Sequence, residues 1–445
     1  MASEYSNIAS DELKPFLNFF SVEENIARLI DQGQLDQAGH MIGELILHAV
    51  NTTEFMGRAL YVNELDQLCV RLGSEVDSYG VETTNPSKKT PLILVTELYR
   101  TGGHSRIVED LLQLFPEAEV WMTGYYPPSS NRDLALCQGI PTVDATQIPK
   151  DNLCYQIQRL RRMVIKRGSM VFHVAHHHDV VINAALSGVR HIPLFFMHHS
   201  DHQFSLGCTI ENFIHVDLAN HVHSICQHFL GGRSQLWPQG VSDHGRKIFE
   251  YPLKEIISAT SGTSVKFTFE GPLSLPEIVR ASLSSGAQIH YHIGPLEPAQ
   301  FDLILNQLTQ YCIDHLRFRY VESVTSLWDF LLKSDVNLFI GSAPMHGLRT
   351  ALEVQGCGIP IMPFSQSGHP LLQERQHYPP GTVFWQSPTD LGKLFEVVNN
   401  AHQEISNQTR LHFEQNFSIR LMSNAIETSI QSFYKKSADH QTKAN

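Results

Sequence analysis

Ionisable and hydroxyl side chains gather in residues 198–207, which read HHSDHQFSLG. This segment places His199, Asp201 and His202 directly after an apolar run. A histidine beside a carboxylate can act as a general base, because the carboxylate fixes the tautomer of the imidazole. Loops that follow strands carry functional sites more often than packing. We therefore predict that this segment contributes catalytic residues; the alternative is a hydrogen-bond network that braces the loop.

A glycine turn lies nearer the start of the chain, where residues 101–106 read TGGHSR. Gly102 and Gly103 let the backbone approach a ligand closely, and the helix that follows offers free N–H groups to an anion. His104, at the start of that helix, is a second candidate base. Neither G-x-G-x-x-G nor G-x-x-x-x-G-K-[ST] occurs, so a nicotinamide-dinucleotide site or a P-loop is not supported. The local sequence leaves open whether the turn binds a ligand or only joins a strand to a helix.

A third polar segment, residues 173–179, reads HVAHHHD and accounts for part of the unusual total of 25 histidines. A zinc site needs three or four convergent ligands, and the spacing here is not that of H-E-x-x-H or another familiar closed site. We therefore predict no catalytic metal, and expect some of these histidines to line a site for a hydroxyl-rich ligand.

The most specific segment is residues 335–353, DVNLFIGSAPMHGLRTALE. An apolar strand ends in a loop of small residues, and a helix begins near Gly347. Backbone N–H groups at that helix start suit a diphosphate, and His346 and Arg349 add donors or positive charge. Glu353, about two turns further along, could reach a ribose diol. The alternative is a plain strand–loop–helix unit. The predicted donor-binding residues are His346, Gly347, Arg349, Thr350, Glu353 and, in a later turn, Gly368.

The elements that must position these residues fall into three parts. Apolar residues at helical spacing predict helices in residues 1–88. Alternating strands and helices then predict an N-terminal acceptor domain over residues 89–255 and a C-terminal nucleotide-sugar domain, with terminal helices, over residues 256–445. Among the expected strands are residues 221–225 and 265–269. The predicted fold class is α/β, with two Rossmann-like domains.

Composition excludes several classes of protein. The formal charge of −12 argues against a nucleic-acid binder, whose affinity would come from Lys and Arg on phosphates. Apolar residues make up 42% of the chain, yet no apolar run approaches the roughly 20 residues that cross a bilayer. The seven cysteines are widely spaced without a C-x-x-C. We expect a cytoplasmic protein without a transmembrane segment.

The chain resembles glycosyltransferases of the GT-B architecture. Residues 335–363 resemble the nucleotide-sugar half of that superfamily, including a G-x-P turn at residues 358–360. The TGGH loop resembles its acceptor-side glycine loop. Residues 198–207 are similar to a His-rich stretch in bacterial protein glucosyltransferases related to O-GlcNAc transferase.

This resemblance implies a nucleotide-sugar donor, here predicted to be UDP-linked, with no cofactor and no essential metal. The acceptor would be a protein, a glycan or a small molecule. His104 or Asp201 would be the base, with His199 and His202 in support, and Lys266 would hold the diphosphate. Retaining members often carry two Glu residues with seven positions between them; Met345 stands where the partner of Glu353 would be, which favours inversion.

Two other functions stay open. A sugar-nucleotide epimerase could use the same fold without an acceptor. A non-catalytic partner subunit could retain the fold and use residues 1–88 as a docking surface.

Overall fold

A computed structural model describes residues 19–51, 61–77, 89–99, 103–128, 130, 140–144, 152–199, 203–365 and 375–444. The chain divides into two compact units. The first contains Met1–Trp237 and Ser423–Asn445, and the second contains Pro238–Met422. Among the described residues, no helix combines the length and the apolar character that a bilayer crossing demands.

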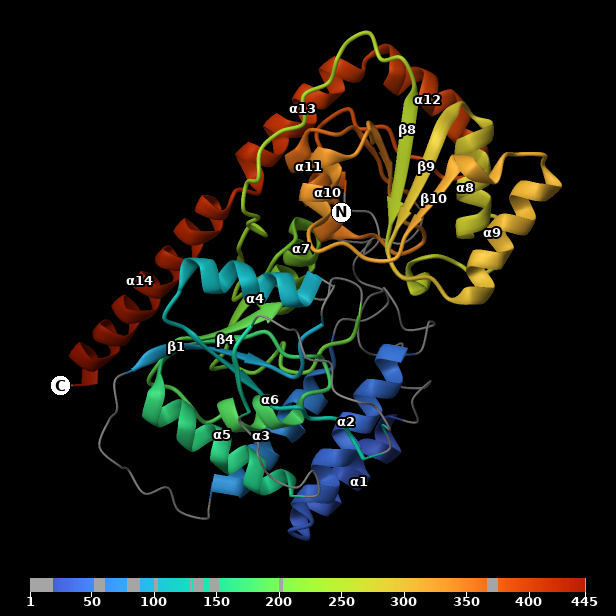
Figure 1. The fold of residues 1–445 in the computed structure, drawn as a ribbon. Helices are drawn as coiled ribbons and strands as arrows, with labels where there is room; N and C mark the ends of the chain where they lie inside the picture. Colours follow the sequence, from blue (N-terminus) through green and yellow to red (C-terminus); the bar gives the residue numbers. More distant parts are fainter. Residues whose placement is uncertain are drawn as a thin grey trace. The chain divides into compact units, whose positions relative to one another are not determined.

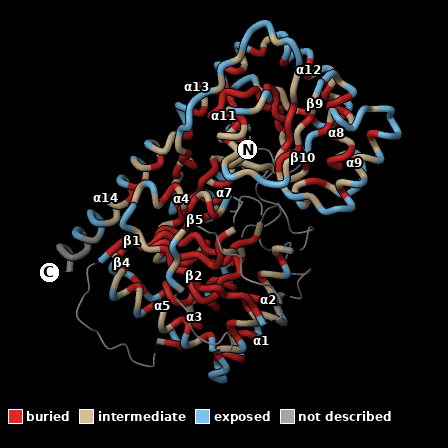
Figure 2. The backbone as a smooth tube through the Cα atoms, in the orientation of Figure 1, coloured by how far each residue is buried: buried red, intermediate tan, exposed pale blue. Residues whose placement is uncertain are grey.

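The first unit is built on a parallel sheet of seven strands in the order β3-β2-β1-β4-β5-β6-β7. Every residue of β1 is buried, and Figure 2 shows the strands of this sheet largely in red. Burial on both faces is typical of a parallel sheet covered by helices, and it explains the apolar runs in the sequence. The strands are β1 Thr90–Val95, β2 Glu119–Met122, β3 Thr142–Asp144, β4 Gly168–His173, β5 Leu194–His198, β6 Ile214–Asp217 and β7 Gln235–Leu236.

The strand order reverses between β1 and β4, which places a topological switch point there. In open α/β sheets, ligands bind outside the carboxyl ends of the strands at such a point. The helices that alternate with these strands are α4 Gly103–Leu114, α5 Leu153–Arg167, α6 Val180–Leu186 and α7 Asn220–Phe229.

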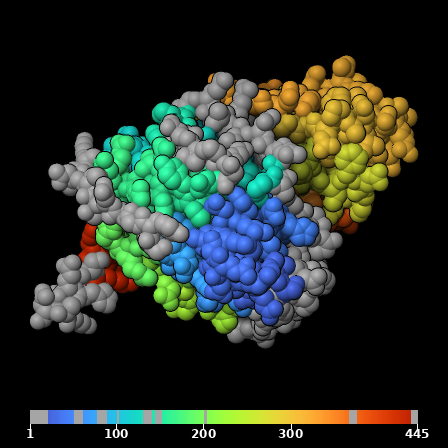
Figure 3. Space-filling model, turned by 90° about the horizontal axis from the view of Figure 1, so that it is seen from below, coloured from blue at the N-terminus to red at the C-terminus, as the bar shows by residue number. Residues whose placement is uncertain are grey.

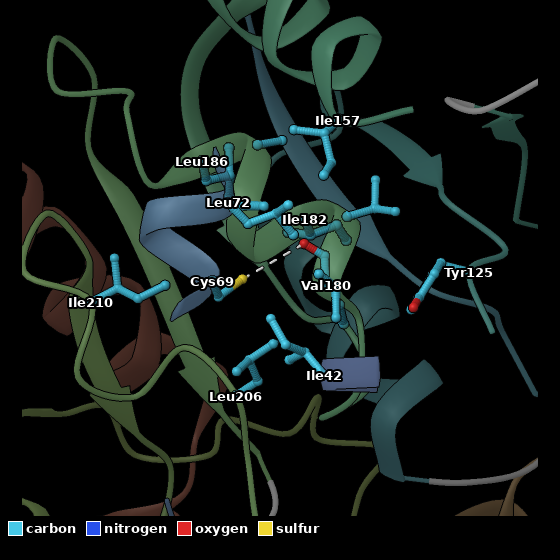
Figure 4. Packing of buried hydrophobic residues seen from close by; sticks show 14 of the residues in the cluster. Ile42, Cys69, Leu72, Tyr125, Ile157, Val180, Ile182, Leu186, Leu206 and Ile210 are labelled. Atoms are coloured by element: carbon cyan, nitrogen blue, oxygen red, sulfur yellow. Dashed lines mark hydrogen bonds between the residues drawn. The ribbon is translucent and has the colours of Figure 1, made fainter. Parts of the chain in front are cut away.

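Three helices that precede β1 in the sequence pack onto part of the first unit. They are α1 Phe19–Asp31, α2 Leu35–Asn51 and α3 Asn63–Asp77. Ile42 and Leu72 are buried in one core with Ile157 of α5, and Cys69 of α3 donates a weak hydrogen bond to the Val180 carbonyl (Figure 4). Figure 3 shows the outer side of α1 and α2 at the surface of this unit. The predicted helices are therefore present and pack as part of the core; a docking role stays a prediction.

The second unit repeats the plan with a parallel sheet of five strands in the order β10-β9-β8-β11-β12. Figure 1 shows β8, β9 and β10 of this sheet side by side. The switch point lies between β8 and β11. The strands are β8 Ile256–Ser261, β9 Ala287–Ile293, β10 Phe318–Val321, β11 Leu338–Ile340 and β12 Ile361–Met362. The helices are α8 Leu275–Ser284, α9 Pro298–Gln310, α10 Leu327–Lys333, α11 Leu348–Cys357, α12 Leu391–Asn400 and α13 His402–Asn416, and short 3-10 turns include η3 Ser264–Lys266.

The units divide at Trp237/Pro238, earlier than the predicted 255/256 boundary. Residues that follow the division are tied to the second unit: Arg410 pairs with Asp243, and Trp328 Nε1 donates to the Gly245 carbonyl at 2.9 Å. The last helix, α14 Ile419–Ala444, belongs mostly to the first unit, where Ser429 Oγ accepts a bond of 2.9 Å from Trp237 Nε1.

Two expected strands are wrong. Residues 221–225 lie in helix α7, whose Val222, Ile225 and Cys226 are buried at helical spacing. Residues 265–269 begin in η3, and Val265 is 69% exposed, so this run cannot be a central strand. The strand of that region is β8, a few residues earlier.

Helix α11 is held so closely against α10 that one glycine has no room for a side chain. A Cβ on Gly356 would lie 1.8 Å from Cη2 of the buried Trp328. We expect Gly356→Ala to destabilise the second unit by about 3 kcal/mol, because overpacking displaces a rigid ring. Gly392→Ala in α12 is the control; the nearest atom to its Cβ would be 3.4 Å away, and helix propensity predicts a gain of about 0.5 kcal/mol. Urea unfolding measures both, and equal midpoints would contradict the packing.

Candidate functional site

One buried carboxylate connects the loops that follow β1 and β4 through hydrogen bonds. Asp179 caps the start of α6 by accepting from the Ile182 N–H at 3.0 Å. It also accepts from Thr96 Oγ1 at 2.7 Å and from Thr123 Oγ1 at 2.5 Å, which follow β1 and β2. Burial raises the pKa of Asp179 to about 6, against the hydrogen bonds that lower it. Asp179 therefore fixes the carboxyl ends of three sheet segments at the switch point.

His104 lies at the start of α4, at the same edge of the sheet. Its Nε2 is 2.5 Å from the Val174 carbonyl, which can only accept, so Nε2 carries the proton. The lone pair is therefore on Nδ1, which is buried without a hydrogen-bond partner among the described residues. Burial, and then the nearby His199, lower the pKa of His104 to about 3, so the ring is neutral at physiological pH. This is the protonation state that a general base requires.

Other histidine rings surround His104. Its centroid is 4.7 Å from that of His176 and 5.2 Å from that of His199. His199, the residue after β5, donates from Nε2 to the Ala175 carbonyl at 3.0 Å, so the rings of His104 and His199 are anchored on consecutive carbonyls. Burial lowers the pKa of His176 well below its usual value, and the neighbouring histidines lower it further.

A buried glutamate also belongs to this group of histidine and tyrosine side chains, and the sequence analysis did not single it out. Glu97 follows β1 and is fully buried. The hydroxyls of Tyr99 and Tyr126 both donate to its Oε1. His176 Nε2 lies 3.0 Å from the Tyr99 hydroxyl, which links the carboxylate to the histidine rings. The only sequence signal was an acidic residue directly after a buried strand.

The second group of predicted residues lies in the second unit, after β11. Helix α11 begins with Gly347 as its N-cap, and no described side chain caps it. Its first backbone N–H groups therefore lack intrahelical partners, as at any helix start. Lys266, from the turn after β8, donates from Nζ to the His346 carbonyl at 3.2 Å. The two strands that flank the switch point thus bring an ammonium group and a helix N-terminus together.

Further along α11, Arg349 Nε donates to Glu353 Oε1 at 3.2 Å, and each side chain is 13% exposed. The two residues predicted to hold diphosphate and ribose therefore pair with each other in this structure. Thr350 lies beside the N-cap; a Cβ on Gly347 would be 3.2 Å from Thr350 Oγ1.

The structure thus joins His104 with His199, Lys266 with His346, and Arg349 with Glu353. Gly103 is the first residue of α4. The remaining predicted residues, Gly102, Asp201, His202 and Gly368, lie outside the described residues. Their roles stay predictions.

Comparison with known proteins shows the fold. No family model matches the chain, and no curated protein matches its sequence. Among solved structures, Anabaena HepE in complex with UDP superposes with a TM-score of 0.58 at 13% identity, covering 77% of this chain and all of that one. The chain has the GT-B fold. This GT-B chain also resembles a glycosyltransferase from Rickettsia africae (TM-score 0.57, 10% identity, 78% and 100% coverage). A third match is the lipopolysaccharide outer core galactosyltransferase WaaB in its apo form (TM-score 0.55, 14% identity, 77% and 99% coverage).

Proposed function

We propose that this protein is a glycosyltransferase that moves a sugar from a UDP-linked donor to an acceptor hydroxyl with inversion at the anomeric carbon. The observation that carries the proposal is the position of Lys266 Nζ, 3.2 Å from the His346 carbonyl at the start of α11. Together the ammonium group and the helix N-terminus suit a diphosphate. The solved structures of HepE with UDP and with UDP-glucose, on the same fold, support the choice of nucleotide.

The reaction exchanges one bond at the anomeric carbon for another. The acceptor oxygen attacks that carbon, and the bond from carbon to the diphosphate oxygen breaks, so the electron pair leaves with UDP. His104 Nδ1 takes the acceptor proton, because its lone pair is fixed by the bond from Nε2 to Val174. Lys266 and the N–H groups of α11 stabilise the negative charge that develops on the diphosphate.

Inversion rests on the residue pattern before α11. Retaining relatives of this architecture often pair two glutamates, and Met345 occupies the position of the first. A methionine cannot stabilise a positive charge on the sugar as a carboxylate can. The acceptor stays one of three classes: protein, glycan or small molecule.

The proposal is tested with the full chain and nucleotides. UDP should raise the melting temperature more than GDP, TDP or CMP, because a ligand at 100 times its Kd stabilises by about 2.7 kcal/mol. Labelled UDP-sugars should then yield labelled acceptor and UDP. Isomerised nucleotide sugar without transfer would favour the epimerase, and binding of none of the nucleotides would contradict the donor site.

Replacing Glu353 tests the ribose contact. We expect Glu353→Ala to weaken UDP binding about tenfold or more, because a hydrogen bond to a carboxylate is worth roughly 1.5–3 kcal/mol. Glu396→Ala, on the exposed side of α12, is the matched control. Calorimetric titration with UDP and with 2′-deoxy-UDP separates the mechanisms. If Glu353 contacts the ribose diol, the wild type should bind UDP more tightly than 2′-deoxy-UDP, and Glu353→Ala should lose this preference. If Glu353 acts only through Arg349, Glu353→Ala should keep the preference for UDP.

A further inference from the structure

A second cluster of side chains in the first unit is separate from His104 and has no part in the proposed transfer. His198 ends β5, His215 and Asp217 share one face of β6, and Cys226 lies in α7. All four are buried. The register of the sheet sets the pattern, because the Cα atoms of His198 and Asp217 are direct partners across β5 and β6.

The four potential ligand atoms lie within 4.8 Å of one another. Asp217 Oδ1 is 3.0 Å from both His198 Nδ1 and His215 Nε2, and Cys226 Sγ is 3.5 Å from His198 Nδ1. In a tetrahedral zinc site the bond lengths imply edges of about 3.3 Å between nitrogen and oxygen and about 3.6 Å between sulfur and nitrogen. Three of the measured distances therefore match these edges to within about 0.3 Å. The two ligand atoms that lie furthest apart would have to approach by about 1 Å to bind the same ion.

The ring of His215 is oriented by the backbone on the side away from Asp217. Its Nδ1 lies 3.2 Å from the Cys208 carbonyl, which can only accept, so Nδ1 carries a proton. The other ring nitrogen, Nε2, faces Asp217 Oδ1 at 3.0 Å. A bond from the far ring nitrogen to a backbone carbonyl is also the usual support of a metal-binding histidine.

The other oxygen of Asp217 is held in place. Oδ2 accepts from the Ser234 hydroxyl and lies 3.3 Å from His223 Nδ1. His223 Nδ1 is also 3.0 Å from Ser234 Oγ. These partners anchor the carboxylate so that only Oδ1 faces the two histidines, as in a carboxylate that binds a metal through one oxygen.

We propose that His198, His215, Asp217 and Cys226 bind one Zn²⁺ as a structural ion. Thiolate, imidazole and carboxylate are each ligands that Zn²⁺ takes in tetrahedral sites, and a thiolate with a carboxylate neutralises the charge of the ion. Four protein ligands leave no open position for substrate, so the ion ties β5, β6 and α7 together and does not act in transfer. The proposal does not depend on the proposed function.

Cobalt is the probe, because its spectrum reports thiolate ligation. The full chain is produced in zinc-free medium with cobalt and dialysed. The wild type should retain about one cobalt per chain, with tetrahedral visible bands and thiolate-to-cobalt charge transfer. Cys226→Ser should lose the charge-transfer band. Its affinity for cobalt should fall by more than 10–100-fold, which is the typical cost of removing a residue that only supports a metal ligand. Cys69→Ser, another buried thiol of this unit (Figure 4), should keep both signals.

The wild type decides the question even where Cys226→Ser does not fold. A wild type without cobalt, or with cobalt but no thiolate band, overturns the proposal and leaves a buried imidazolium–carboxylate pair as the state of the cluster. The same holds for a thiolate band that survives in a folded Cys226→Ser.

Discussion

His104→Ala should lower kcat about 10²–10⁴-fold and leave the Kd for UDP unchanged. The reason is the fixed tautomer: the bond from Nε2 to the Val174 carbonyl leaves the lone pair on a buried Nδ1. Removing the ring removes the atom that accepts the proton, whereas the predicted nucleotide-binding residues lie in the other unit. Single-turnover transfer and calorimetric titration measure the two quantities.

Two further variants separate catalysis from structure. His104→Gln retains a donor for the Val174 carbonyl but supplies no base, so its kcat should fall as far as that of His104→Ala. His228→Ala removes an exposed histidine of α7 and should leave kcat unchanged. Recovery of activity in His104→Gln would show that the ring only supports the loop, and would overturn its role as base.

Lys266→Met should lower kcat about 10²–10³-fold, the usual cost of losing one group that stabilises developing charge. The ammonium group lies at the start of α11, where the departing diphosphate is proposed to bind. Lys266→Arg should recover part of the loss, because the charge remains. Lys333→Met, an exposed lysine at the end of α10, is the control.

Binding gives the complementary readout for Lys266. UDP affinity should fall in Lys266→Met and be largely retained in Lys266→Arg. A loss of the same size in both variants would show that the hydrogen bond to the His346 carbonyl matters only for the shape of the turn. Full activity in Lys266→Met would place the diphosphate elsewhere.

Much of the α/β arrangement could be read from apolar runs. Such runs mark β1 and β11, because strands buried on both faces have no room for polar residues. Strand β8 was missed because two of its three buried positions are the polar residues Ser258 and Thr260. These hydroxyls are satisfied by residues distant in sequence: Ser258 Oγ lies 2.8 Å from His290 Nδ1 and Thr260 Oγ1 lies 3.0 Å from His292 Nδ1. A polar strand of this kind cannot be recognised without knowing its partners.

The candidate site was predictable to a similar extent. His104 and His199 each follow a strand that flanks or neighbours the switch point, so strand order alone brings them close. Glu97 could not be singled out, because its role depends on Tyr126, which approaches from the loop after β2. The pairing of Arg349 with Glu353 follows from their spacing of four on a helix, yet the sequence reasoning gave them separate tasks.

Because the last helix belongs mostly to the first unit, it affects how the two units can be produced as separate fragments. Because α14 restores the chain to the first unit after Met422, that unit is not one continuous stretch of polypeptide. A stop codon after Trp237 would remove Ser429, the hydrogen-bond partner of the indole. A faithful single-unit fragment therefore has to splice residue 237 to residue 423 through a short artificial linker, while the second unit can be excised as one contiguous piece.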